Sequence, residues 1–173
     1  SIEHLGSANT LIFVLDPFQD PGLRDVLSKT DPQFKIFTKG GSARQDLLIL
    51  ETADRIRRLQ GKSTEEKLNI PVVFTINKLD AWAALVDDID FSISPFTIDD
   101  EGNTKLNLEV IESVNKSMRK MLQTYVPDWL DAMDAISTDI TIVPCAPLGI
   151  SPTGDEFGAL QIEIASVSPI WAD

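Results

Sequence analysis

Pro71-Val72-Val73-Phe74-Thr75-Ile76-Asn77-Lys78-Leu79-Asp80 is the stretch that decides the fold of this chain. Its first six residues form a run that is almost entirely apolar or β-branched, which is typical of a strand buried on both faces in a parallel sheet. The run then ends abruptly in three polar side chains, Asn77, Lys78 and Asp80. Because ligands bind beyond the carboxyl ends of the strands in open α/β sheets, these three residues are candidates for a binding site.

Two further short apolar runs, at 10–16 and 139–144, predict neighbouring strands of the same sheet. Between the runs, apolar residues at helical spacing predict helices near 43–59, capped by Ser42, and near 107–125. The first helix should bury Ala43, Leu47, Leu50, Ala53 and Ile56. The second should bury Ile111, Val114, Met118, Met121, Leu122 and Tyr125. We therefore expect a single α/β domain over residues 1–173, with three layers and a mostly parallel sheet.

The rest of the chain predicts shorter elements. Residues 91–105 should form a hairpin that turns at Glu101-Gly102-Asn103, and 159–167 alternates like an edge strand. The acidic residues Asp87, Asp88 and Asp90 do not have the spacing of an EF-hand loop, so a solvated loop is expected there rather than a cation site.

Composition narrows the class of partner. The chain has 173 residues and a net charge of −12, which argues against binding nucleic acid or an anionic membrane surface. No run approaches the roughly 20 apolar residues of a membrane span, so no membrane insertion is expected. A single cysteine, Cys145, excludes an internal disulfide and suits a reducing, cytoplasmic setting.

The segment Asn77-Lys78-Leu79-Asp80 resembles the guanine-specificity motif of GTPases, Asn/Thr-Lys-x-Asp after a hydrophobic strand. Guanine carries two adjacent donors, a ring N–H and an amino group, and one carboxylate accepts both. Asp80 would take this role. Lys78 would lay its aliphatic stem over the purine face, and Asn77 would tie the loop to its neighbours.

A second loop follows the third predicted strand, with the sequence Pro144-Cys145-Ala146-Pro147-Leu148-Gly149. It resembles the second base-contacting loop of GTPases, often Ser-Ala-x, in which a backbone N–H reaches the guanine carbonyl oxygen. Ala146 occupies that position, and Cys145 stands where serine is usual. An alternative role for Cys145 is that of a nucleophile, for which His4, the only histidine, is the single possible partner.

The order of these elements is similar to the C-terminal half of a P-loop GTPase domain. The stretches Leu11–Pro17, Pro21–Arg24 and Ser168–Trp171 resemble the bacterial double-GTPase group of the TRAFAC class. The resemblance implies that the chain is an excerpt of a larger domain. The missing N-terminal half would be its partner, and the complete parent would bind GTP or GDP with Mg²⁺.

The phosphate-binding machinery of that family is absent from the sequence. Gly61-Lys62-Ser63-Thr64 matches the tail of a Walker A loop, but Ile56 stands at the position of the first glycine. The segment also follows a predicted helix, whereas a phosphate loop follows a strand and opens a helix. Asp16 ends the first predicted strand and is expected to be a polar strand end rather than a Mg²⁺ ligand.

Two functions fit these observations. The first is the guanine-nucleotide-binding portion of a GTPase-like protein, which would carry the base-recognition loops and would not hydrolyse GTP alone. The alternative is a non-catalytic pseudo-GTPase or α/β interaction scaffold, whose loops keep the shape and bind no nucleotide.

Overall fold

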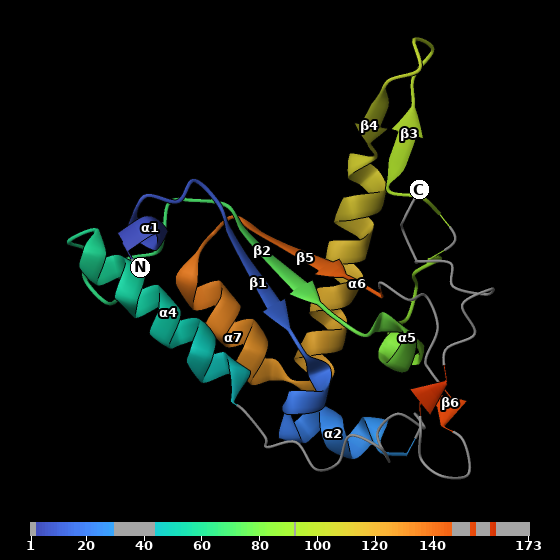
Figure 1. The fold of residues 1–173 in the computed structure, drawn as a ribbon, viewed down its shortest axis with the longest axis horizontal. Coiled ribbons are helices and arrows are strands. Elements are labelled where there is room, and N and C mark those ends of the chain that lie inside the picture. The colour runs from blue at the N-terminus through green and yellow to red at the C-terminus, as the bar shows by residue number, and fades with distance from the viewer. Residues whose placement is uncertain (1–2, 30–43, 92, 147–152, 155–159, 162–173) are drawn as a thin grey trace.

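A computed structural model describes residues 3–29, 44–91, 93–146, 153–154 and 160–161. Its centre is a sheet of three parallel strands, β1 (Leu11–Leu15), β2 (Val72–Ile76) and β5 (Ile140–Pro144), in the order β1-β2-β5 (Figure 1). All three predicted strands are therefore confirmed as neighbours in one sheet, and the α/β class is confirmed with them.

One face of this sheet carries the core, and we call it the first face. It is formed by alternate residues of the three strands, with Leu11 aligned to Val72 and Val72 aligned to Ile140. The rings of Phe13 and Phe74 stack on this face with their centroids 5.0 Å apart. Side chains at these positions are buried or half-buried because two helices cover them.

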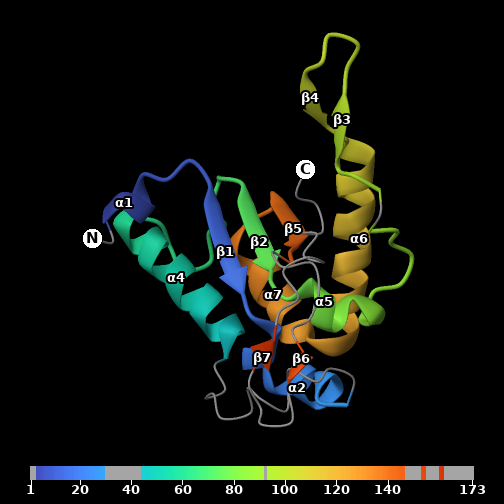
Figure 2. The ribbon, with the colours of Figure 1, turned by 45° about the vertical axis from the view of Figure 1, so that its right-hand side comes forward.

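Those two helices are α4 (Gln45–Leu59) and α7 (Pro127–Ile136), which pack against each other on the same side of the sheet (Figure 2). A third long helix, α6 (Leu108–Tyr125), lies beside β5 and contacts α7. Its predicted stripe is confirmed for Val114, Met118, Met121 and Leu122, which are buried, whereas Ile111 and Tyr125 at its ends are only half-buried. Asn107 caps its first turn. Pro127 opens α7, a helix of ten residues that the sequence patterns above do not predict.

The predicted face of α4 is wrong in part. Leu47 is 54% exposed, whereas Ile49, Ala53 and Ile56 are fully buried. The helix begins at Gln45 after Arg44, which makes no side-chain capping hydrogen bond, and the predicted cap Ser42 and Ala43 lie outside the described residues. The error arises because α4 also buries polar residues, among them Arg57, whose side chain is hydrogen-bonded inside the protein. The buried face of the helix therefore includes these polar residues and leaves Leu47 in solvent.

The shorter elements surround this core. The hairpin β3 (Phe96–Ile98) and β4 (Thr104–Leu106) is antiparallel and turns over Gly102, as predicted. Of the predicted strand 159–167, only β7 (Leu160–Gln161) is described, paired with β6 (Thr153–Gly154). The remaining elements are α1 (Glu3–Gly6), η1 (Pro17–Gln19), α2 (Pro21–Leu27), α5 (Leu79–Trp82) and η2 (Ala83–Leu85).

The opposite side of the sheet, the second face, has little cover. Ile12 and Val14 on β1 are 68% and 67% exposed, and the aligned residues of β2 and β5 are half-buried. The expected three layers are thus complete on one side only within the described part of the chain. No helix among the described residues combines the length and the apolar character needed to cross a membrane.

Candidate functional site at the carboxyl ends of the strands

The loops that follow β2 and β5 lie side by side at the carboxyl edge of the sheet. The N–H of Asn77 donates to the carbonyl of Leu15, and the N–H of Cys145 donates to the carbonyl of Ile76. One residue past Lys78, the N–H of Leu79 donates to the carbonyl of Cys145 over 3.0 Å. The backbone therefore joins the 77–80 loop to the 145–146 loop directly, as expected for residues at the ends of neighbouring parallel strands.

Asn77 organises the start of the 77–80 loop. Its side-chain oxygen accepts the N–H of Lys78 at 3.0 Å, and its carbonyl accepts the indole N–H of Trp82 at 2.7 Å. Trp82 is 1% exposed, so the indole anchors the loop to the core. The sequence predicts a tying role for Asn77 but none for Trp82, although the place of Trp82, five residues after Asn77 in the turn that follows the strand, is a signal for it.

Lys78 adopts the left-handed conformation, with φ 58° and ψ 40°. This region is strained for a residue with a side chain, and such strain concentrates at functional sites. Its ammonium lies 2.9 Å from Asp16 Oδ2 and 4.2 Å from the centre of the Phe18 ring. The side chain is therefore held by the end of β1, a relationship that the sequence did not reveal.

Asp16 directly follows β1, as expected, and its side chain caps the short helix η1. Its Oδ1 accepts the N–H of Phe18 at 3.0 Å, and its Oδ2 pairs with Lys78. Among the residues that the structure describes, no group of three acidic, histidine or cysteine side chains is arranged to hold a metal ion.

Asp80 and the 145–146 loop complete the candidate site. Asp80 is half-buried in the first turn of α5, and Ala146 is 1% exposed. Burial raises the pKa of the half-buried Cys145 thiol above its ordinary value, which lowers its thiolate fraction. His4 lies in α1, beside α4 and near the amino end of β1, so the structure does not bring it to Cys145 (Figure 1).

The segment Gly61–Thr64 does not form a phosphate loop. Gly61 has φ +67° in the turn after α4, and the N–H of Ser63 donates to the carboxylate of Glu66. The segment then leads into β2 rather than into a helix. Its N–H groups are consequently not gathered at a helix start, where a phosphate would bind.

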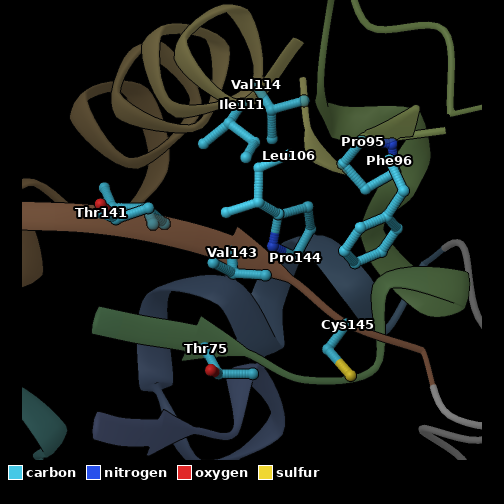
Figure 3. A pocket seen from close by; sticks show the side chains of 11 residues that line it. Thr75, Pro95, Phe96, Leu106, Ile111, Val114, Thr141, Val143, Pro144 and Cys145 are labelled. Atoms are coloured by element: carbon cyan, nitrogen blue, oxygen red, sulfur yellow. The ribbon is translucent and has the colours of Figure 1, made fainter. Parts of the chain in front are cut away.

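An apolar groove of about 380 Å³ opens next to the site on the second face (Figure 3). It runs between β2, β5, α6 and the β3–β4 hairpin, and Cys145 belongs to both the groove and the 145–146 loop. Its other lining residues include Thr75, Phe96, Leu106, Ile111 and Val143.

Comparison of the chain with models of protein families, with curated proteins and with solved structures finds no match.

Proposed function

We propose that this chain is the base-reading part of a guanine-nucleotide-binding protein, formed by Asn77, Lys78 and Asp80 together with Cys145 and Ala146. The observation that carries the proposal is the hydrogen bond from the N–H of Leu79 to the carbonyl of Cys145. It holds two loops, each with a base-contacting sequence, at one edge of a parallel sheet.

Asp80, Ala146 and Lys78 each have a separate role in the proposed recognition of guanine. The Asp80 carboxylate accepts the ring N–H and the amino group of guanine, and adenine has no equivalent donor pair. The backbone N–H of Ala146 donates to the guanine carbonyl oxygen. The stem of Lys78, fixed through Asp16 and Phe18, covers one face of the purine.

The proposed site does not include the phosphates or Mg²⁺. Gly61–Thr64 lies in a turn, and no metal-ligand cluster is found among the described residues, so the proposal assigns no phosphate or Mg²⁺ contact to them. Mg²⁺ in the parent would neutralise developing charge on the phosphates. Since phosphoryl transfer depends on positioning those phosphates, we expect no GTP hydrolysis by this chain alone.

An α/β interaction scaffold is the second candidate function. The apolar groove and the exposed side chains of Ile12 and Val14 favour it, because contiguous exposed apolar surface marks interaction sites. A scaffold would show no difference between guanine and adenine nucleotides.

Titration of the ¹⁵N-labelled chain with GMP and with AMP separates the two functions. Monophosphates test base recognition without needing a phosphate loop. GMP should shift the amide signals of residues 77–80 and 145–146, and AMP at equal concentration should not. Identical responses to both nucleotides would contradict base reading.

The substitution Asp80→Asn tests the assigned carboxylate. It replaces one acceptor by a donor, so GMP should bind about ten- to a hundredfold more weakly, which corresponds to about 1.5–3 kcal/mol. XMP, which has a carbonyl in place of the amino group, should recover much of this loss. Asp131→Asn, an exposed change on α7 with the same change in charge, is the matched control and should bind GMP like the unmodified chain.

A further inference from the structure

The β3–β4 hairpin projects from the body of the protein at the amino end of α6, and we call its residues 96–106 the arm. Both views show the arm extending beyond the sheet and the helices, with no other described helix or strand beside its turn (Figures 1 and 2). A two-stranded hairpin is only marginally stable by itself in water, so local contacts must fix its shape. The side chain of Asp99 does so, because it accepts the N–H groups of Glu101 and Asn103 at 3.0 and 2.8 Å.

One side of the arm is apolar. In the antiparallel register, Phe96 lies opposite Leu106 and Ile98 lies opposite Thr104, so these four side chains share one face, which we call the arm face. Ile98 is 76% exposed, Leu106 57% and Phe96 39%. Among the described residues, five of the ten large apolar side chains that are exposed lie between positions 93 and 108. This concentration of exposed apolar surface is typical of an interaction site.

Acidic side chains border the arm face. Asp99, Asp100 and Glu101 lie at the turn of the hairpin, and Glu109 lies in the first turn of α6. The one basic residue of the arm, Lys105, has its place on the opposite face and pairs with Asp99 at 2.8 Å. The arm therefore combines an apolar face with a net negative charge at its tip and base.

This charge distinguishes between the possible partners. Nucleic acid and an anionic membrane surface would be repelled by the acidic turn. A second copy of the chain would bring the same acidic turn and a net charge of −12 against the arm. A protein surface that carries lysine and arginine around apolar residues has the complementary charge, which steers its approach and disfavours acidic competitors.

We propose that the arm face docks on a separate protein, at a patch of apolar residues ringed by lysine and arginine. Apolar contact with the arm face supplies the affinity, and the acidic turn selects the partner. This surface goes beyond base recognition, because the arm contributes no residue to the 77–80 and 145–146 loops and docking through it needs no nucleotide.

Photo-crosslinking of the protein in its own cells tests the proposal. A photoreactive phenylalanine analogue replaces Thr104, an exposed residue of the arm face, and the adducts are mapped by mass spectrometry. The adducts should join one other protein, at apolar residues with lysine or arginine beside them. The same analogue at Leu48, 54% exposed on α4, is the control and should not join that protein.

Two double substitutions test the role of the acidic turn. Asp100→Lys with Glu101→Lys reverses its charge and should lower the adduct yield by about tenfold or more. Asp25→Lys with Asp131→Lys makes the same change in net charge at exposed positions on α2 and α7, and should leave the yield within about twofold. Equal yields from the two proteins would overturn the proposal. Adducts with a second copy, adducts within the same chain, or a yield no higher than that at Leu48 would also overturn it.

Peptide titration of the unmodified ¹⁵N-labelled chain is the second measurement, because lysine at the turn can disturb the hairpin itself. One synthetic peptide alternates leucine and lysine, and the other alternates leucine and glutamate. The leucine–lysine peptide should shift the amide signals of residues 96–98 and 104–106, and the leucine–glutamate peptide at equal concentration should not. Equal responses to the two peptides, including none, or shifts centred outside the arm would contradict the proposed docking surface.

Discussion

Lys78 Nζ lies 2.9 Å from Asp16 Oδ2, an ion pair that joins the carboxyl ends of β2 and β1. The two side chains are 28% and 32% exposed, so water screens the pair only in part. The Phe18 ring beneath the ammonium limits its freedom further. Through these contacts, the first strand positions a side chain of the candidate base site.

Asp16→Asn should therefore affect binding more than stability. Loss of a partly exposed pair should lower the free energy of unfolding by less than about 1 kcal/mol. A less fixed Lys78 should bind GMP about threefold more weakly, which amounts to about 0.7 kcal/mol. Urea unfolding and GMP titration measure the two effects. Glu51→Gln, which breaks the exposed pair with Arg55, is the control and should leave GMP binding unchanged.

Arg57 should contribute strongly to stability. Its guanidinium, on a residue only 3% exposed, donates to the carbonyl of Glu66, to Asp54 and to the carbonyl of Ala135. Arg57→Met would leave these acceptors without their partner, at a cost of about 3 kcal/mol in the free energy of unfolding.

The neighbouring Arg58 provides the control for this experiment. It is exposed and makes one weak contact, to the carbonyl of Asp54 at 3.3 Å, so Arg58→Met should change stability by less than about 0.5 kcal/mol. Equal midpoints of urea unfolding for the two variants would show that the buried contacts of Arg57 are not important for stability.

Asp46 should make stability depend on acid pH. Two hydrogen bonds from Arg44 lower the pKa of its carboxyl group below the ordinary value of 3.8. A lowered folded-state pKa stabilises the folded state above pH 3.8, and this contribution disappears as the pH falls through the folded-state value. Asp46→Asn should therefore cost about 1–2 kcal/mol at pH 7, and progressively less below pH 3.8.

The pH series for this variant should be compared with one for Asp131→Asn. Asp131 is exposed on α7, so its substitution should change the free energy of unfolding by less than about 0.5 kcal/mol. A constant deficit for Asp46→Asn between pH 7 and pH 3 would contradict the role given to its charge.

Cys145 should react slowly with alkylating reagents. Burial raises the pKa of its thiol above the ordinary value of 9.0, so less thiolate is present at neutral pH than in an exposed cysteine. The rate of reaction with iodoacetamide should rise about tenfold for each pH unit up to pH 9. A rate that levels off below pH 8 would show a lowered pKa and revive the nucleophile hypothesis.

The sheet was predictable because its strands have a simple pattern. Continuous apolar runs bounded by polar or proline residues defined β1, β2 and β5, and the period of α6 was equally clear. The face of α4 was not predictable, because Gln45 and Arg57 are buried through partners far away in the sequence. Sequence periodicity counts apolar residues and cannot represent a buried polar group whose partner is 29 or 78 residues distant.

The candidate site was likewise predictable from the sequence only in part. Its local motifs could be read directly, since Asn77, Lys78 and Asp80 follow one strand and Cys145 follows another. The contact between Lys78 and Asp16 spans 62 residues, and the incomplete cover of the second face depends on where whole helices pack. These features come from the tertiary arrangement, so no local pattern indicates them.

The amide of Gln45 ends the outer edge of β1 in a polar side chain. It pairs with both the N–H and the C=O of Asp16, so the peptide groups at this strand end are satisfied without a further strand. Each such bond contributes only about 1 kcal/mol net, but a buried peptide group without a partner would cost more. A side chain from the first turn of α4 thereby does the work of a neighbouring peptide group, and it fixes the start of that helix against the end of β1.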